Sequence, residues 1–230
     1  MGVNVNSSSN YANMPGMSNT DTETTSESNE ETTETGELLI EDGYLYVDAN
    51  GDGLDSNTSI TMTGGIVLVY GPSSSGNGSL DYDQSFNIEG GTLVAVGSSG
   101  MAQGVSEDSS QSTIMMTYSE IQNAETTLYL ENSNGGEKIL AIEPEKDFQT
   151  ILISSEDLQQ GKNYILYNGG SITGDKVDGV YENADYQEGT QAIEFTLNTA
   201  MTYLNEEGVT EQQTNPKGGR WGGQRKDFNQ

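Results

Sequence analysis

The sequence predicts an all-β protein, in which about two to three stacked β-coils precede an antiparallel β cap or sandwich-like region. Three observations predict it. Gly43, Gly65 and Gly91 lie 22 and 26 residues apart, which is within the range of coil repeats. Short apolar segments alternate with acidic turns around these glycines. The 230 residues include 29 glycines and only four prolines, a composition that suits many tight turns.

Two related units define the coils. The segment DANGDGLD (48–55) leads into ITMTGGIVLV (60–69), and GNGSLDYD (76–83) leads into FNIEGGTLVAV (86–96). Five residues separate Asp55 from Ile60, and five separate Asp81 from Phe86. Each unit therefore joins an acidic turn to apolar strands that flank a pair of glycines.

Alignment on the three glycines predicts which side chains point inward. Alternate residues of a strand point to one face. The inward ladders are Leu45, Val67 and Leu93, followed by Val47, Val69 and Ala95. The outward ladders are Tyr44, Ile66 and Thr92, followed by Tyr46, Leu68 and Val94. Because this outward face is too apolar for open water, we expect the C-terminal region to cover it.

The rest of the chain divides by composition. Residues 1–36 form a Ser, Thr and Glu-rich stretch that we expect to be a disordered linker, and residues 37–104 hold the coils. A C-terminal β region follows over 105–205, and a disordered tail follows over 206–230. Turn signals separate the strands expected in the C-terminal region. These strands are Thr113–Tyr118, Thr126–Leu130, Lys138–Ile142, Gln149–Ser154, Asn163–Tyr167 and Ile193–Leu197.

The first coil begins at Leu38 without a polar element to cap it. A solenoid needs at least three repeats to bury its core, and bare sheet edges are hazardous. Our interpretation is that the chain is a fragment from which upstream coils and a signal peptide are missing, and that the protein is extracellular or on the cell surface.

Charge and missing residue types exclude several functions. The net charge is −28, and residues 37–205 carry 26 acidic residues against four lysines. The electrostatic field of this negative charge repels nucleic acid and anionic lipid, and so disfavours both as partners. Cysteine and histidine are both absent, which excludes disulfides, ordinary zinc sites and histidine-dependent nucleophiles. No apolar run is long enough for a transmembrane helix. Divalent cations are the obvious counter-ions for so acidic a chain.

Asp48, Asn50, Asp52 and Gly53 have the spacing of a calcium loop. An EF-hand needs an acidic residue at the twelfth position, where this chain has Ser59. We expect the shell to be completed instead by Asp55, or by Asp81 and Asp83 from the next coil. The predicted metal ligands are therefore Asp48, Asn50, Asp52, Asp55, Asp81 and Asp83. The alternative is that Asp, Asn and Gly simply favour turns.

The sequence gives weaker signals for catalysis and for sugar contact than for metal binding. Asp81 and Asp83 flank Tyr82 and resemble a glycosidase carboxylate pair, but no apolar pocket is predicted to raise either pKa. A lyase needs a basic residue, and the nearest in sequence to the coils is Lys138. Tyr70 and Tyr82, near turns, are candidates either for stacking on sugar or for packing. The residues favour binding over catalysis.

The block DGYLYVDANGDGLDSNTSITMTGGIVLVYGPSSSGNGSLDYDQSFNIEGGTLVAVGSSGMAQ (42–103) resembles a carbohydrate-binding family typified by a clostridial cell-surface protein. KDFQTILISSEDLQQGKNYILYNGG (146–170) continues the resemblance. It implies a right-handed parallel β-helix, secretion, bound calcium, and binding of acidic plant polysaccharide such as polygalacturonate in pectin, without established catalysis. We therefore expect an extracellular calcium-dependent carbohydrate-binding protein. The alternatives are a calcium-dependent polysaccharide lyase or hydrolase, and a structural surface or adhesion module.

Overall fold

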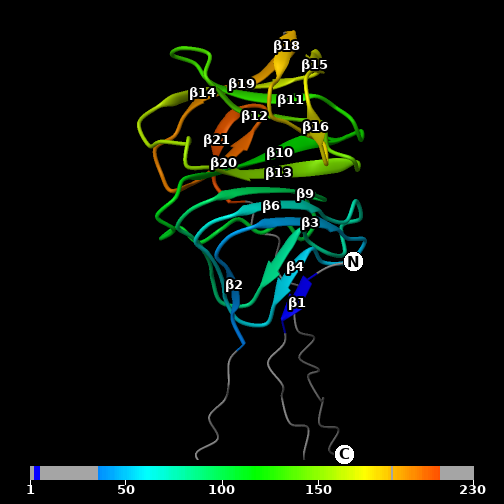
Figure 1. The fold of residues 1–230 in the computed structure, drawn as a ribbon, viewed down its shortest axis with the longest axis vertical. Coiled ribbons are helices and arrows are strands. Elements are labelled where there is room, and N and C mark those ends of the chain that lie inside the picture. Colours follow the sequence, from blue (N-terminus) through cyan, green and yellow to red (C-terminus); the bar gives the residue numbers. More distant parts are fainter. Residues whose placement is uncertain (1–2, 6–35, 188, 213–230) are drawn as a thin grey trace, which may run out of the picture.

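A computed structural model describes residues 3–5, 36–187 and 189–212. All the regular secondary structure in these residues is β, with 21 strands in five sheets (Figure 1). The described residues include no helix that is long and apolar enough to cross a membrane.

Residues 36–97 pass repeatedly through three ladders of parallel strands. The first ladder contains β2 (Leu38–Ile40), β5 (Ile60–Met62) and β8 (Phe86–Ile88). The second contains β3 (Tyr44–Asp48), β6 (Ile66–Tyr70) and β9 (Thr92–Gly97). The third contains β4 (Leu54–Ser56) and β7 (Leu80–Tyr82), with β1 (Val3–Val5) paired to β4. Each circuit therefore lies on the next in parallel register.

The predicted register is confirmed in the second ladder. Leu45 pairs with Val67 and Val67 with Leu93, while Val47 pairs with Val69 and Val69 with Ala95. These side chains join one apolar core inside the circuits, together with Leu54, Ile60, Met62, Leu80, Phe86 and Ile88. Leu45 in the first circuit is only partly buried, whereas its partner Val67 is fully buried.

Glycine forms one corner of each circuit, singly at Gly43 and as pairs at 64–65 and 90–91. Gly65 and Gly91 have φ values of 84° and 86°, in a region that side chains other than glycine rarely adopt. A Cβ on Gly91 would lie 2.5 Å from the carbonyl oxygen of Gly65. The repeated glycine spacing therefore reflects both the backbone conformation and the close stacking of the corners.

The second ladder continues into a mixed sheet of seven strands. Its order is β21-β20-β10-β13-β9-β6-β3, and Figure 1 shows β13 and β10 stacked on β9, β6 and β3. β13 pairs antiparallel with β9 and β10, whereas β20 pairs parallel with β10. The four added strands are β10 (Thr113–Gln122), β13 (Phe148–Ser154), β20 (Met201–Asn205) and β21 (Gly208–Thr210).

A second sheet lies against the first. Its six strands are β16 (Lys176–Val177), β17 (Val180–Tyr181), β12 (Lys138–Ile142), β11 (Leu128–Asn132), β14 (Asn163–Asn168) and β19 (Thr190–Thr196). β15 (Ser171–Thr173) and β18 (Asp185–Gln187) form a separate pair. Side chains of the seven-stranded and six-stranded sheets share one apolar core.

The expected cover over the outward face is confirmed for part of it. Leu68 and Val94 are each 2% exposed and lie in the core shared with the C-terminal region. Tyr44 and Ile66, the first residues of β3 and β6, stay 51% and 46% exposed.

The structure also differs from the predicted boundaries. Residues 1–36 were expected to lack structure, but Val3–Val5 pairs with β4; residues 6–35 lie outside the described residues. Residues 206–212 were expected to belong to a disordered tail, but Gly208–Thr210 forms an edge strand on β20. Residues 213–230 lie outside the described part. The C-terminal region is not purely antiparallel, since β10 and β20 run in the same direction.

Candidate functional site in the acidic turns

The first acidic turn follows β3 and surrounds a lysine ammonium group. Lys146 Nζ lies 3.0 Å from Asp48 Oδ1, 2.6 Å from the Ala49 carbonyl oxygen and 3.3 Å from Asn50 Oδ1. Lys146 belongs to the connection between β12 and β13, in the C-terminal region. Two predicted calcium ligands therefore contact a cation that the protein itself supplies.

Asp52 and Gly53 hold one turn against the next. Asp52 Oδ1 accepts a hydrogen bond from the backbone N–H of Gly78 at 2.8 Å, and Gly53 N–H donates to the Gly78 carbonyl at 3.1 Å. A Cβ on Gly53 would lie 2.3 Å from the carbonyl oxygen of Ser79. Close stacking of the circuits therefore explains this glycine.

Asp55 and Asp81 are brought together by the third ladder. They are register partners on the parallel strands β4 and β7, so their Cα atoms are about 4.8 Å apart. Their neighbours Leu54 and Leu80 point into the core, and both aspartates are only partly buried. Like charges in direct register repel each other, and a cation that bound both carboxylates would offset that repulsion.

Asp83 lies just beyond β7 and is exposed, and its backbone N–H donates to the Ser56 carbonyl at 3.1 Å. The six predicted ligands are thus distributed over several positions. In the described residues, no three acidic side chains form a group that could hold a metal ion.

The fit to calcium differs between these positions. Calcium takes six to eight oxygens. The oxygens of Asp48 and Asn50 already face the Lys146 ammonium, and a divalent ion at the same point would be repelled by it. Asp55 and Asp81 provide two carboxylates from adjacent strands, so backbone and water oxygens would have to complete the shell.

The two tyrosines proposed for sugar contact are held by packing. Tyr70 is 1% exposed, and its hydroxyl donates to the Asp178 carbonyl. Tyr82 is partly buried; its ring contacts Phe86 edge-on at 6.1 Å, and its hydroxyl donates to the Gly104 carbonyl at 2.8 Å. No ring face of Tyr70 is therefore open to a sugar in this structure.

Hydrogen bonds from tyrosine to acidic residues join the circuits to the C-terminal region. Tyr44 donates to Asp178 Oδ2 at 2.5 Å and Tyr46 donates to Glu145 Oε2 at 2.8 Å. The pKa of both phenols is raised. Burial is the larger cause, and these hydrogen bonds are the second. The partners are 134 and 99 residues apart in the sequence, so no local sequence pattern predicts either hydrogen bond.

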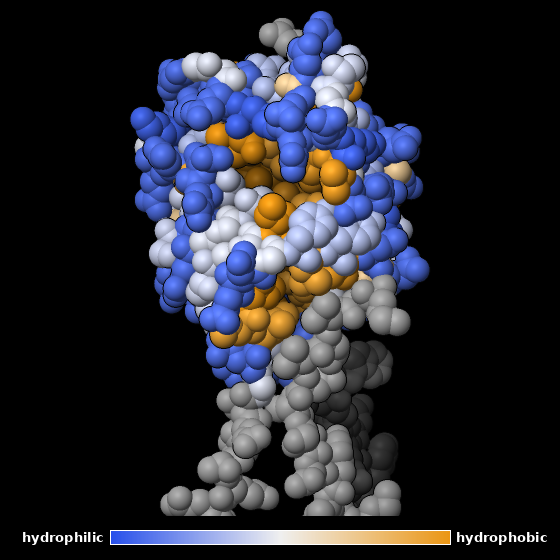
Figure 2. All heavy atoms as spheres, in the orientation of Figure 1, coloured by the Kyte–Doolittle hydropathy of each residue, from blue (hydrophilic) through white to orange (hydrophobic). Residues whose placement is uncertain are grey.

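An apolar cleft of about 410 Å³ opens beside these contacts. Its walls include Ile66, Val94, Ile139 and Val180, with Lys138 at the polar part of its lining. The ammonium of Lys138 donates to the carbonyls of Tyr181 and Glu182. Figure 2 shows apolar residues gathered in hollows on one face of the molecule, surrounded by hydrophilic residues.

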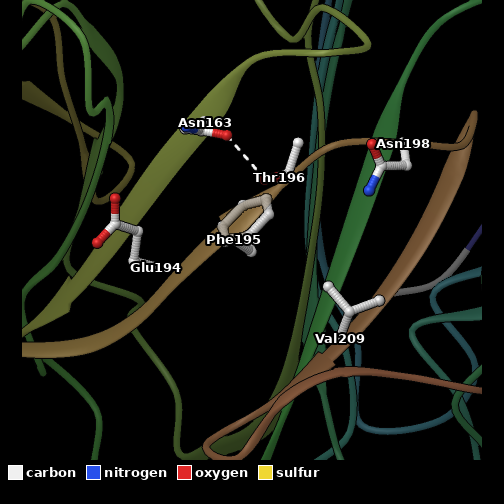
Figure 3. Close-up of a pocket in the computed structure, with 6 residues that line it drawn as sticks. All are labelled: Asn163, Glu194, Phe195, Thr196, Asn198 and Val209. Atoms are coloured by element: carbon white, nitrogen blue, oxygen red, sulfur yellow. Dashed lines mark hydrogen bonds between the residues drawn. The ribbon is translucent and has the colours of Figure 1, made fainter.

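A second pocket of about 440 Å³ is lined by residues of β14, β19 and β21 and of the segment after β19 (Figure 3). Its lining is mainly polar and consists of Asn163, Glu194, Phe195, Thr196, Asn198 and Val209. Thr196 Oγ1 donates to Asn163 Oδ1 at 2.7 Å. The acidic turns do not contribute to this pocket.

Comparison with family models, with curated proteins and with solved structures finds no match to this chain. The resemblance drawn from residues 42–103 therefore stays a prediction.

Proposed function

We propose that the circuits through the three parallel ladders are coils of a right-handed parallel β-helix, and that this chain is an extracellular protein that binds acidic polysaccharide through calcium. Polygalacturonate is the proposed ligand class. The observation that carries the calcium part is the register of Asp55 with Asp81 on adjacent parallel strands.

Stacked strands suit a polymer because they repeat the same chemistry at a fixed spacing along an extended surface. The third ladder presents aspartates in this way, with Asp83 exposed at its end. An anionic polymer does not approach so acidic a surface unaided, since the chain carries a net charge of −28. A calcium ion that binds both protein and polymer carboxylates removes that obstacle.

A binding role is favoured over a lyase. The structure brings Lys146 to the first turn, although the sequence of the coils contains no basic residue. Its ammonium donates to three protein oxygens, so it is engaged in that contact and is not presented to a substrate as a base.

Pull-down on immobilised polygalacturonate and on neutral glucans, with calcium or with chelator, tests the proposal. We expect retention on polygalacturonate in calcium and loss in chelator. The variant Asp55→Asn/Asp81→Asn should lose retention, whereas Glu194→Gln, which removes an exposed carboxylate far from the ladder in sequence, should keep it. Equal retention with and without calcium, or no retention on any polymer, would contradict it; unsaturated products absorbing in the ultraviolet would indicate a lyase.

A further inference from the structure

We infer that Lys146 is the built-in cation of the Asp48–Asn50 turn, and that calcium must displace its ammonium to bind there. The primary observation is the convergence of oxygens from three consecutive residues on one nitrogen, at 2.6–3.3 Å. One of the three is a backbone carbonyl, so the turn itself is shaped around the ammonium. Carboxylate, amide and carbonyl oxygens are also the ligands that calcium prefers.

The contact of Lys146 with the turn connects the C-terminal region to the first circuit. Its neighbour Glu145 accepts the hydrogen bond from Tyr46 on β3, two residues before Asp48. The connection between β12 and β13 therefore contacts the first circuit at two adjacent points. The Lys146 side chain is 18% exposed, against 57% for Asp48, so the ammonium is the more shielded partner.

A tethered ammonium competes with a dissolved ion. Because the lysine is part of the folded chain, its effective concentration at the turn is high and does not change on dilution. Calcium at the same oxygens must overcome this competition and must also release the connection to β13. The turn is thus neutralised without a metal, and its calcium affinity is lowered by Lys146.

The calcium part of this inference rests on the proposed function, whereas the stabilising role of the ammonium does not. The test compares melting temperatures of the wild type, Lys146→Met, Lys146→Met/Asp48→Asn and the control Lys162→Met. Lys162 is exposed and lies before β14, so its removal changes the net charge equally without altering the turn.

In chelator, Lys146→Met should melt about 4–8 °C below the wild type, while Lys162→Met stays at the wild-type value. Excess calcium should raise the melting temperature of Lys146→Met by more than that of the wild type, and Asp48→Asn should abolish this extra gain. If Lys146→Met does not fold, Lys146→Gln, which keeps an amide donor, should show the same pattern with a smaller loss.

Equal melting temperatures of the Lys146 and Lys162 variants in chelator would overturn the inference. A calcium-dependent rise in melting temperature that is no larger in Lys146→Met than in the wild type would also overturn it. The polymer pull-down is independent of both readouts. A chain that shows the expected melting pattern but is not retained on polygalacturonate would refute the proposed function and leave the Lys146 inference standing.

Discussion

The hydroxyl of Tyr70 donates a hydrogen bond to the backbone carbonyl of Asp178 at 2.6 Å, across 108 residues of sequence. Tyr70 ends β6 in the second circuit, and its ring lies in the core between the two large sheets. Asp178 joins β16 to β17 and has a φ of 45°. A Cβ on the next residue, Gly179, would lie 2.4 Å from the Tyr70 hydroxyl, so glycine makes this contact possible.

Tyr70→Phe should lower the free energy of unfolding by about 1 kcal/mol, because it leaves the Asp178 carbonyl without this donor while keeping the ring. Urea denaturation measures the difference. Tyr44→Phe is the matched control, since Tyr44 bonds the same residue from an exposed position and should cost less. A Tyr70→Phe protein as stable as the wild type would show that the hydroxyl adds nothing.

Stability should fall in alkali. Burial raises the pKa of Tyr203 to about 12 and also raises the pKa of Tyr70 and Tyr118. Unfolded tyrosine has a pKa of about 10. Above that pH the unfolded chain loses protons that the folded protein keeps, so the free energy of unfolding drops by about 1.4 kcal/mol per pH unit for each such tyrosine.

Urea denaturation from about pH 9 to pH 11, with tyrosinate absorbance of the folded and unfolded protein, checks this dependence. Tyr70→Phe should have a shallower slope because it removes one of these protons. A free energy of unfolding that stays flat over this range would contradict the raised pKa values.

Gly53→Ala should destabilise the protein by about 1–3 kcal/mol, because its Cβ would meet the Ser79 carbonyl oxygen and Val69. Gly51→Ala is the control in the same turn; a Cβ there has no atom within 4 Å, and its cost should stay within about 0.5 kcal/mol. Thermal or urea unfolding measures both. Equal costs for the two substitutions would mean that the turns do not stack as closely as described.

The sequence was informative wherever one repeated pattern determined the contacts. The glycine spacing predicted the register that pairs Leu45 with Val67 and Val67 with Leu93, because equivalent glycine corners align the strands of successive circuits. The equal spacings from Asp55 to Ile60 and from Asp81 to Phe86 likewise agree with the register of Asp55 and Asp81. These contacts follow from local periodicity, which sequence alone can show.

Contacts between the circuits and the C-terminal region were not predictable in this way. Lys146 lies 98 residues from Asp48, and nothing in its surroundings distinguishes it from an exposed lysine. Tyr70 was predicted near a turn with equal prospects of packing and sugar contact, and only the position of the second sheet shows that it is buried. The strand β1 was missed because three residues within a polar stretch carry too little apolar pattern.

Calorimetric titration with calcium tests most directly whether stacked aspartates bind a cation. We expect the wild type to release or absorb heat with saturation, and Asp55→Asn/Asp81→Asn to lose that signal while remaining folded in chelator, because the substitutions also remove the repulsion between the two carboxylates. Glu194→Gln should keep the wild-type heat. Absence of heat in the wild type, or an unchanged titration in the double variant, would contradict the account.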